Sequence, residues 1–250
     1  MIKVINLYKK IEKKIVLNGL NLHVQKGKIT VITGLSGSGK SILLKTIVGL
    51  VKPDSGKIIV DGEDISTLRG AKLINFRKKI GFLFQGGALF DSLSVFDNVA
   101  FPLREHTKLS KKEIESKVMH ELQEVGLADS VNKLPSELSG GMNKRAALAR
   151  ALILNPDCLL LDEPATGLDP VMAKIIYDMI DKISTKGITV LMISHNLQAV
   201  SRIADFIAMI CRGQIIEYNI PDKFFTSENP IVQQFISGRA HGPIGLNMGD

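Results

Sequence analysis

The chain has 250 residues, 45% of them hydrophobic and 23% charged, and a formal net charge of +7. A chain of this length buries about 75% of the surface that its unfolded form exposes, so its core needs no disulfide bonds. The two cysteines, Cys158 and Cys211, lie far apart in apolar runs, which predicts reduced core residues of a cytosolic protein. These properties argue against a small, disulfide-stapled secreted domain.

The sequence also argues against a membrane-spanning protein. No apolar run approaches the roughly 18 residues that cross a bilayer, and the start becomes polar too soon for a signal peptide. Lys9, Lys10, Lys13 and Lys14 fit either a surface for anionic lipid or nucleic acid, or a solvated strand edge and turn, which is the commoner case. Because basic and aromatic residues do not interleave, we expect no nucleic-acid partner.

The predicted elements alternate between strands and helices. Leu20, Leu22 and Val24 alternate with polar residues, which predicts a half-buried strand. The apolar run 29–33 predicts a buried parallel strand that enters a glycine-rich loop, and a helix is predicted over 41–50. Further strands are predicted at 57–60, 80–84, 158–161, 188–194 and 206–211. This alternation indicates an α/β fold with a parallel sheet covered by helices.

Between residues 86 and 155 the pattern becomes mostly helical. Ser110 and Glu113 predict a capping box, after which apolar residues recur on one helix face from Ile114 to Val125, and Gly126 ends the helix. We therefore expect a helical lobe inserted into the α/β core.

The end of the chain, after Pro221, is expected to be separate from the core. Its spaced apolar residues predict one short amphipathic helix, followed by an extended glycine-rich stretch beyond Gly238. These apolar residues are Phe224, Phe225, Val232, Phe235 and Ile236.

A phosphate-binding loop follows the strand at 29–33. Its residues are Gly34, Leu35, Ser36, Gly37, Ser38, Gly39, Lys40 and Ser41, a full match to G-x-x-x-x-G-K-[ST]. Glycines allow backbone N–H groups to converge on phosphate oxygens, and the next helix directs its positive end toward them. Lys40 supplies a charge at the β- and γ-phosphates, and Ser41 is the expected Mg²⁺ ligand. The loop therefore predicts ATP and Mg²⁺ as cofactors.

Two carboxylates follow a buried strand, where α/β sheets place ligands. Asp162 and Glu163 come directly after Leu159–Leu161. Asp162 is the expected partner of Mg²⁺ through water, and Glu163 is placed to polarise the attacking water as general base. A solvated strand end is the alternative interpretation of such a pair taken alone.

A second predicted anion site lies at Ser139, Gly140 and Gly141. A serine and two glycines precede the helical sequence 143–150 and present N–H groups at a helix start. Since the chain already has a phosphate loop, this turn is expected to contact the γ-phosphate of ATP held by a second copy.

The order of phosphate loop, LSGG turn and strand-borne carboxylates resembles the ATP-binding cassette (ABC) family over residues 1–225. The resemblance implies a P-loop NTPase (RecA-like) core at 1–85 and 156–222 with an antiparallel β part. It also implies a helical subdomain at 86–155, and we expect 223–250 to be a dimerisation tail.

The resemblance also assigns site residues and partners. Gln85 is implied to touch Mg²⁺ and the attacking water, and His195 to contact the γ-phosphate. A homodimer arranged head to tail is implied, with Asp169 at its seam and a membrane permease at the loop after Gln85. Two positions depart from the family pattern: Met142 replaces a glutamine, and the adenine-stacking aromatic expected near Ile11 is missing, Tyr8 being the nearest candidate.

Three segments narrow the resemblance to the ATPases of Mla/MCE-type lipid transporters. They are FQGGALFDSLSVFDNVAFPLREHT, LSGGMNKRAALARA and NPIVQQFISGRAHGPIG. This implies an ATPase at the cytoplasmic face of the bacterial inner membrane that drives phospholipid transport with a permease and an MCE-domain protein. In such ATPases the tail contributes to the dimer, so 230–245 is expected either to clasp the neighbouring copy or to be a frayed terminus.

Other functions remain open from the sequence. They are an importer ATPase for a small polar solute such as an amino acid, a soluble cassette acting on ribosomes or DNA, and a degenerate nucleotide sensor. The single set of motifs argues against the second, and the intact Lys40, Glu163, Ser139 and His195 argue against the third.

Overall fold

The computed structural model describes residues 1–245 in two compact units. The first unit comprises Met1–Thr67 and the chain from Ile193 onward, and the second comprises Leu68–Met192. The subdomain boundaries expected from the sequence stay a prediction, and the end of the expected tail, 246–250, lies outside the described residues.

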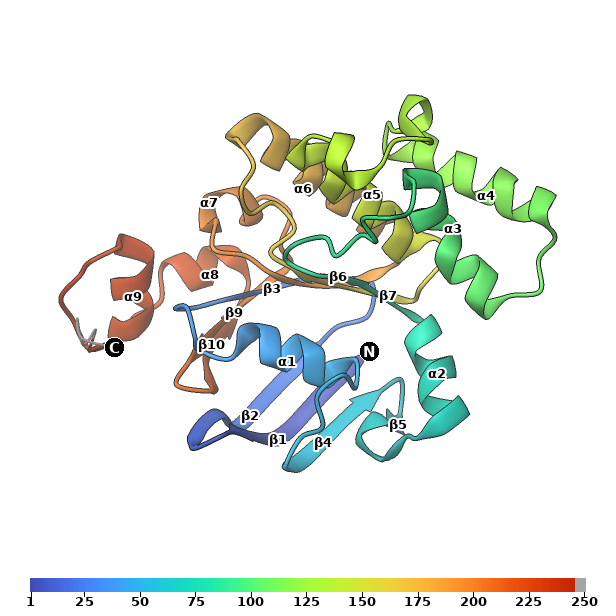
Figure 1. Ribbon diagram of the computed structural model, residues 1–250. Helices are drawn as coiled ribbons and strands as arrows, with labels where there is room; N and C mark the ends of the chain where they lie inside the picture. The colour runs from blue at the N-terminus through green and yellow to red at the C-terminus, as the bar shows by residue number, and fades with distance from the viewer. Residues whose placement is uncertain (246–250) are drawn as a thin grey trace. The chain divides into compact units, whose positions relative to one another are not determined.

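An antiparallel sheet with the order β2-β1-β4-β5 lies in the first unit (Figure 1). Its strands are β1 (Ile2–Ile11), β2 (Lys14–Val24), β4 (Ser55–Val60) and β5 (Glu63–Asp64). Leu20, Leu22 and Val24 are buried and the polar residues between them are exposed, which confirms the predicted half-buried strand. The lysine-rich segment forms the β1–β2 hairpin, where Lys9 pairs with Asp54 at 2.9 Å.

The other strands of the first unit flank the glycine-rich loop. β3 (Ile29–Thr33) pairs in parallel with β9 (Phe206–Cys211), and β10 (Gln214–Asn219) runs antiparallel to β9. All residues of β3 are buried, as expected for a strand covered on both faces. The loop leads into helix α1 (Lys40–Ile47), and the short α7 (Leu197–Val200) follows later.

The C-terminal segment forms two helices, so the expectation of one helix is wrong. These are α8 (Pro221–Phe225) and α9 (Pro230–Ser237). A new helix starts at Pro230 because Asn229 caps it and proline is favoured at the first position of a helix. Their apolar residues pack on β9, with Phe224 and Val232 fully buried. The expected extended end is also wrong as far as Gly245, because the chain turns back.

The turn at the C-terminal end is held by one side chain. Ile244 is buried, and its backbone N–H donates to Gln234 Oε1 at 2.9 Å. The Gln234 Nε2 group donates to the Arg239 carbonyl at 3.1 Å. The described part of the tail is therefore folded against its own helix α9.

The second unit contains three strands in the order β8-β7-β6. They are β6 (Ile80–Leu83), β7 (Cys158–Asp162) and β8 (Thr189–Ile193), whose last residue already belongs to the first unit. β6 and β7 are parallel, with Leu83 opposite Leu161. Consequently both strands end at the same edge, and the residues after Leu83 and Leu161 come together there. Helices α2 (Gly70–Lys78) and α6 (Pro170–Thr185) belong to the same unit.

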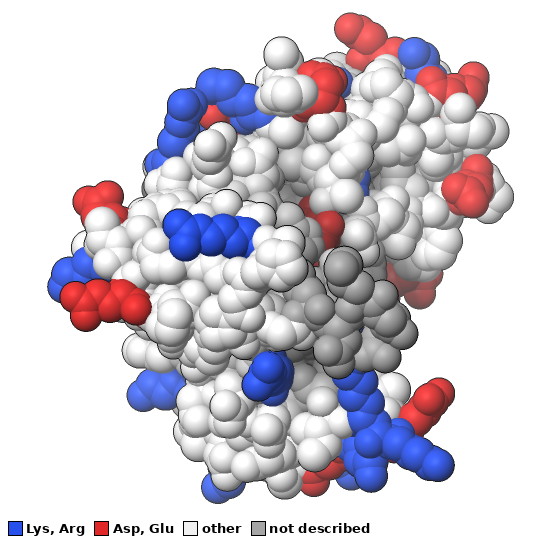
Figure 2. All heavy atoms as spheres, turned by 90° about the vertical axis from the view of Figure 1, so that its left-hand side faces the viewer, with Lys and Arg blue, Asp and Glu red and all other residues white. Residues whose placement is uncertain are grey.

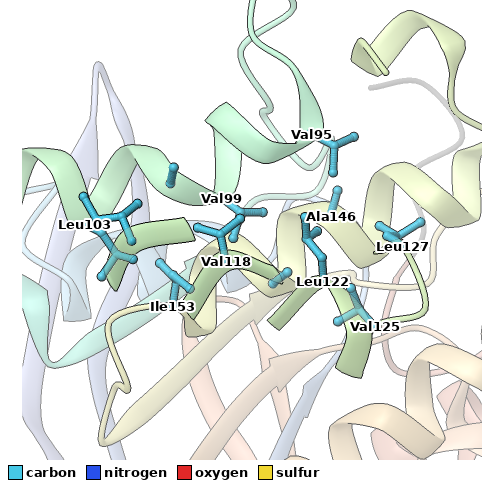
Figure 3. Packing of buried hydrophobic residues seen from close by; sticks show 12 residues of the cluster. Val95, Val99, Leu103, Val118, Leu122, Val125, Leu127, Ala146 and Ile153 are labelled. Atoms are coloured by element: carbon cyan, nitrogen blue, oxygen red, sulfur yellow. The ribbon is translucent and has the colours of Figure 1, made fainter. Parts of the chain in front are cut away.

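Three helices of the second unit share one hydrophobic core (Figures 1 and 3). They are α3 (Val95–His106), α4 (Lys111–Glu124) and α5 (Gly140–Leu152). Figure 3 shows Val99, Val118 and Ala146, one from each helix, pointing into this core. The predicted capping box of α4 is confirmed: Ser110 Oγ accepts from the Glu113 N–H, and Glu113 Oε2 accepts from the Ser110 N–H. Short 3₁₀ turns lie at Ala128–Ser130 and Pro135–Glu137 in this unit, and at Ile65–Thr67 in the first unit.

The surface carries its basic residues in several places. On the face shown in Figure 2, the described lysine and arginine side chains lie in separate groups with uncharged surface between them. Within residues 1–245, no helix combines the length and the apolar character needed to span a bilayer.

Candidate functional site

The phosphate loop lies between β3 and α1 and encloses its lysine. The Lys40 side chain is 6% exposed, and its Nζ donates to the carbonyls of Gly34 at 2.8 Å and Leu35 at 2.7 Å. These bonds fix the ammonium group inside the loop. A positive charge is thereby presented at the start of α1, where phosphate oxygens are expected.

Two glycines allow this loop its tight path. Gly39 has φ +104, and a Cβ atom there would come within 2.8 Å of the Val16 carbonyl oxygen. Gly34 has φ +136, and a Cβ atom there would collide with the carbonyl oxygen of Ile210. Any other residue would be strained in these conformations and would push away the strands that carry Val16 and Ile210.

The start of α1 has polar groups suited to an anion. Its N-cap is Gly39, which offers no side chain to accept from the first helical N–H groups. The Ser38 hydroxyl is buried and has no hydrogen-bond partner among the described residues. A phosphate would accept from both kinds of donor, so these groups could hold one.

The two predicted carboxylates lie at the carboxyl end of β7. Asp162 is 4% exposed, and the backbone of Glu163 has φ +51, a left-handed conformation that is unusual for glutamate. Glu163 Oε2 accepts from Thr166 Oγ1 at 2.6 Å and from Gln85 Nε2 at 3.2 Å. The strained backbone and the two donors together hold the Glu163 carboxylate in one orientation.

A buried lysine completes this cluster, and the sequence analysis missed it. Lys144 of α5 is 9% exposed, and its Nζ donates to the backbone carbonyl of Gln85. Burial lowers the pKa of Lys144, and the carboxylates of Glu163 and Asp162 act in the opposite direction. Helical spacing was the available signal, because Lys144 shares a face with the buried Gly141 and Leu148, three residues before and four after it.

The Ser139–Gly141 turn forms the start of α5. Ser139 and Gly140 are exposed, and Ser139 Oγ accepts from the Met142 N–H at 3.3 Å, which leaves the hydroxyl proton able to donate. A Cβ atom at Gly141 would come within 2.5 Å of Met172 Cε. This position therefore has room only for glycine while Met172 keeps its place.

Two other predicted residues lie in exposed loops. Asp169 caps α6, accepting from the N–H groups of Val171 at 2.9 Å and Met172 at 3.0 Å. His195, in the first unit, follows β8 and is exposed, and its carbonyl accepts from the Leu197 N–H at 3.1 Å. Hence Gln85 and Glu163 are in contact within the second unit, whereas the phosphate loop and His195 belong to the first.

An apolar groove of about 460 Å³ lies beside the end of β6 in the second unit. Phe84, Ala88, Phe90, Phe101 and Arg150 are among its lining residues. Phe90 and Phe101 are 44% and 37% exposed, and their rings are 4.9 Å apart. Large exposed aromatic groups in a hollow are typical of a protein-binding surface.

Comparison with known proteins identifies the class. A family described as "ABC transporter" matches residues 17–166, and the chain therefore belongs to that family. Its fold is that of the ATP-hydrolysing cassette of such transporters. A solved dimeric structure of the ATP-binding cassette MJ0796, bound to ADP and Pi in a post-hydrolysis state, superposes with a TM-score of 0.82 and 30% identity. The match covers 88% of this chain and 99% of that one.

The relatives that the chain resembles in sequence carry one of two names. It is 43% identical to the "Intermembrane phospholipid transport system ATP-binding protein MlaF" of Haemophilus influenzae, over 98% of this chain and 93% of that protein. It is 42% identical to MlaF of Escherichia coli K12, over 92% and 86%.

The second name belongs to mycobacterial proteins. The chain is 43% identical to the "Probable ribonucleotide transport ATP-binding protein mkl" of Mycobacterium leprae, over 91% of this chain. It spans 66% of that relative's length.

Proposed function

We propose that the chain is the ATP-hydrolysing subunit of an ABC transporter that moves phospholipid between the bacterial inner and outer membranes. Membership of the family supports the ATPase part, and the similarity to MlaF over nearly the full length of both proteins supports the cargo. The single observation that carries the chemistry is the pair of hydrogen bonds that orient the Glu163 carboxylate.

ATP is held by the phosphate loop. Its phosphate oxygens accept from the N-terminal N–H groups of α1 and from Ser38, while the buried Lys40 neutralises their charge. The orphaned Ser38 hydroxyl supports this role, because a buried hydroxyl without a partner is costly until a ligand supplies one.

Mg²⁺ fits the donor set of the candidate residues. Ser41, Gln85 and Asp162 offer hydroxyl, amide and carboxylate oxygens, which are the hard ligands that Mg²⁺ prefers. Within residues 1–245 no group of three or more His, Cys, Asp or Glu side chains is placed to hold a metal ion. When bound, Mg²⁺ supplies charge neutralisation to the phosphates.

Hydrolysis depends on Glu163 as the general base. Its carboxylate accepts a proton from the water that attacks the γ-phosphorus, while the bond from that phosphorus to the β–γ bridging oxygen breaks and ADP leaves. Gln85 and Thr166 hold the carboxylate for that step. His195 contacts the γ-phosphate in this proposal. General-base catalysis of this kind is worth about 10² to 10⁴-fold in rate.

The site is completed by a second copy arranged head to tail. Ser139, Gly140 and the start of α5 form an anion site that is exposed and therefore available to the ATP of a partner. The exposed Asp169 lies at the seam in this arrangement, and the dimeric state named for the similar cassette MJ0796 is consistent with it. The tail segment 230–245 contributes to the same dimer.

A membrane permease and an MCE-domain protein complete the transporter. The groove lined by Phe84, Phe90 and Phe101 receives a cytoplasmic segment of the permease, because it is largely apolar and Phe84 directly precedes Gln85 in the chain. Closure of the ATP-bound dimer is transmitted to the permease through this groove. The subunit accordingly works at the cytoplasmic face of the inner membrane as a peripheral protein.

Cargo identity is tested by purifying the full complex from native membranes. We expect a permease, an MCE-domain protein and bound phospholipid, identified by mass spectrometry. Reconstituted complex should transfer labelled phospholipid only with hydrolysable ATP, and a Glu163→Gln complex should not. Recovery of a periplasmic amino-acid-binding protein, or ATP-driven uptake of ribonucleotides as the name of mkl suggests, would overturn the lipid assignment.

A further inference from the structure

Buried charges are rare among the described residues, and one of them has no role in the proposed hydrolysis. Within residues 1–245 the only buried charged side chains are Lys40, Lys144 and Asp162. Lys40 and Asp162 are accounted for by phosphate and Mg²⁺. Burying an ammonium group is costly unless it is compensated, so Lys144 must have a specific compensating partner.

The compensation for Lys144 comes from the site itself. Its Nζ donates to the Gln85 carbonyl, and the negative charges of Glu163 and Asp162 favour the ammonium form. No hydrophobic residue of similar length could supply either interaction. Lys144 therefore links α5 to the loop after β6 by a charge-assisted hydrogen bond.

From Lys144 a continuous chain of hydrogen bonds leads to the general base. Lys144 Nζ holds the backbone of Gln85, and the side chain of the same residue donates from Nε2 to Glu163 Oε2 at 3.2 Å. Thr166 Oγ1 donates to the same carboxylate oxygen at 2.6 Å. A displacement of the Gln85 backbone would thus alter one of the two bonds that orient Glu163.

Helix α5 holds this loop at a second point. The Arg150 Nη2 group donates to the Gly87 carbonyl at 2.8 Å. Both anchors are long cationic side chains from one helix, and both bind backbone carbonyls, so the loop follows α5 as a unit. Lys144 is the anchor nearer the general base.

We propose that Lys144 is a positioning residue that couples the start of α5 to the general base of the same chain by holding the backbone of Gln85. The proposal rests on the proposed function, because it takes Glu163 as the base and the Ser139–Gly141 turn as the partner's phosphate site. Lys144 lies about 7.5 Å along the helix from Ser139. A shift of α5 when the turn binds a partner's phosphate is therefore passed to Gln85 and to Glu163.

The test compares three variants of the purified full chain. Lys144→Met keeps the length of the side chain and removes the hydrogen-bond donor and the charge. Lys144→Arg keeps the donor and the charge. Lys174→Met makes the same change at an exposed lysine on α6 and is the control. We expect Lys144→Met to lower kcat for ATP hydrolysis about 10-fold or more with KM changed less than about 3-fold. Lys144→Arg should recover most of that loss, and Lys174→Met should match the native chain.

A double-mutant cycle with Gln85→Ala tests whether Lys144 acts through Gln85. If it does, Lys144→Met should lower kcat by less than about 2-fold in the Gln85→Ala background. Losses that multiply would overturn the proposal, and so would native kcat in Lys144→Met. If Lys144→Met has no folded state at the assay temperature, as judged by its thermal unfolding, Lys144→Leu, which also removes the donor and the charge, takes its place in the cycle with the same two outcomes.

Failure of this inference is distinguishable from failure of the proposed function. A native chain that does not hydrolyse ATP, or a Glu163→Gln variant that does, contradicts the assignment of the base. A native chain that is active, a Glu163→Gln variant that is inactive and a Lys144→Met variant with native kcat contradict only the role of Lys144.

Discussion

Gln85 donates a hydrogen bond from Nε2 to Oε2 of Glu163 at 3.2 Å, although 78 positions separate the two residues in the chain. The contact exists because β6 and β7 are parallel neighbours, so that the residues following both strands meet at one edge. It joins the loop beside the aromatic groove to the carboxylate proposed as the general base.

Glu163→Gln should lower kcat for ATP hydrolysis by 100-fold or more, because an amide cannot accept the proton of the attacking water. ATP binding should persist, so the variant should elute as an ATP-bound dimer in size-exclusion chromatography. Glu105→Gln, the same change at an exposed position of α3, is the matched control and should keep native turnover. Ordinary turnover in Glu163→Gln would exclude Glu163 as the base.

Lys40→Ala should weaken ATP binding by about 100-fold or more, because a charge-assisted contact with the phosphates is lost from a buried position. Isothermal titration calorimetry with a slowly hydrolysed ATP analogue measures this. Lys45→Ala removes a lysine from the last turn of the same helix and should bind as the native chain does. Equal affinities of the two variants would contradict the role of the phosphate loop.

Thr166→Val should lower kcat about 10-fold and leave KM for ATP nearly unchanged. It removes the 2.6 Å hydrogen bond that orients Glu163, while valine keeps the shape of the threonine side chain. Steady-state kinetics separates the two constants. Thr185→Val, which removes an exposed hydroxyl bonded to the Lys182 carbonyl, is the control. A change confined to KM would mean that Thr166 serves binding rather than orientation.

Phe90→Asp should abolish co-purification of the permease, because it replaces an exposed aromatic ring by a negative charge in the groove that we propose as the docking site. The ATPase activity of the isolated chain should stay within about 2-fold of the native value. Leu134→Asp introduces the same charge at an exposed leucine outside the groove and should leave the complex intact. Loss of the complex in both variants would show that the effect is not specific to the groove.

Glu121→Gln should stabilise the chain at neutral pH. Burial raises the pKa of Glu121 above its usual value, and the nearby Lys186 acts in the opposite direction. A raised folded-state pKa favours folding at a pH below the usual glutamate pKa, and this contribution is lost as pH rises through the folded-state value. Thermal unfolding should therefore give a higher Tm for Glu121→Gln than for the native chain at pH 7.5.

The same comparison near pH 4 should show a smaller difference, because the native carboxyl is then largely protonated. Glu115→Gln, at an exposed position of the same helix, is the control. A difference in Tm that is the same at both pH values would contradict a titration of Glu121.

Strands and helix starts that are determined by neighbouring residues could be predicted from the sequence alone. The strand Ile29–Thr33 and the strand Phe206–Cys211 have the predicted limits, and the capping box at Ser110 has the predicted bonds. In each case the residues that determine the structure are neighbours in sequence or one helical turn apart. The tail was predicted less well, since one helix was expected where two are found. The spacing of its apolar residues looks continuous, but Asn229 and Pro230 start a new helix within it.

The sequence by itself determined the phosphate loop, the carboxylates after an apolar strand and the serine–glycine turn, since each is a contiguous run whose chemistry follows from its own residues. Only the tertiary structure decided that Lys144 is buried against Gln85, and that Gln85 and Thr166 orient Glu163. The bonds from Lys144 and Gln85 span 59 and 78 positions. No local pattern encodes such separations, because they depend on which strands pair and which helix covers them.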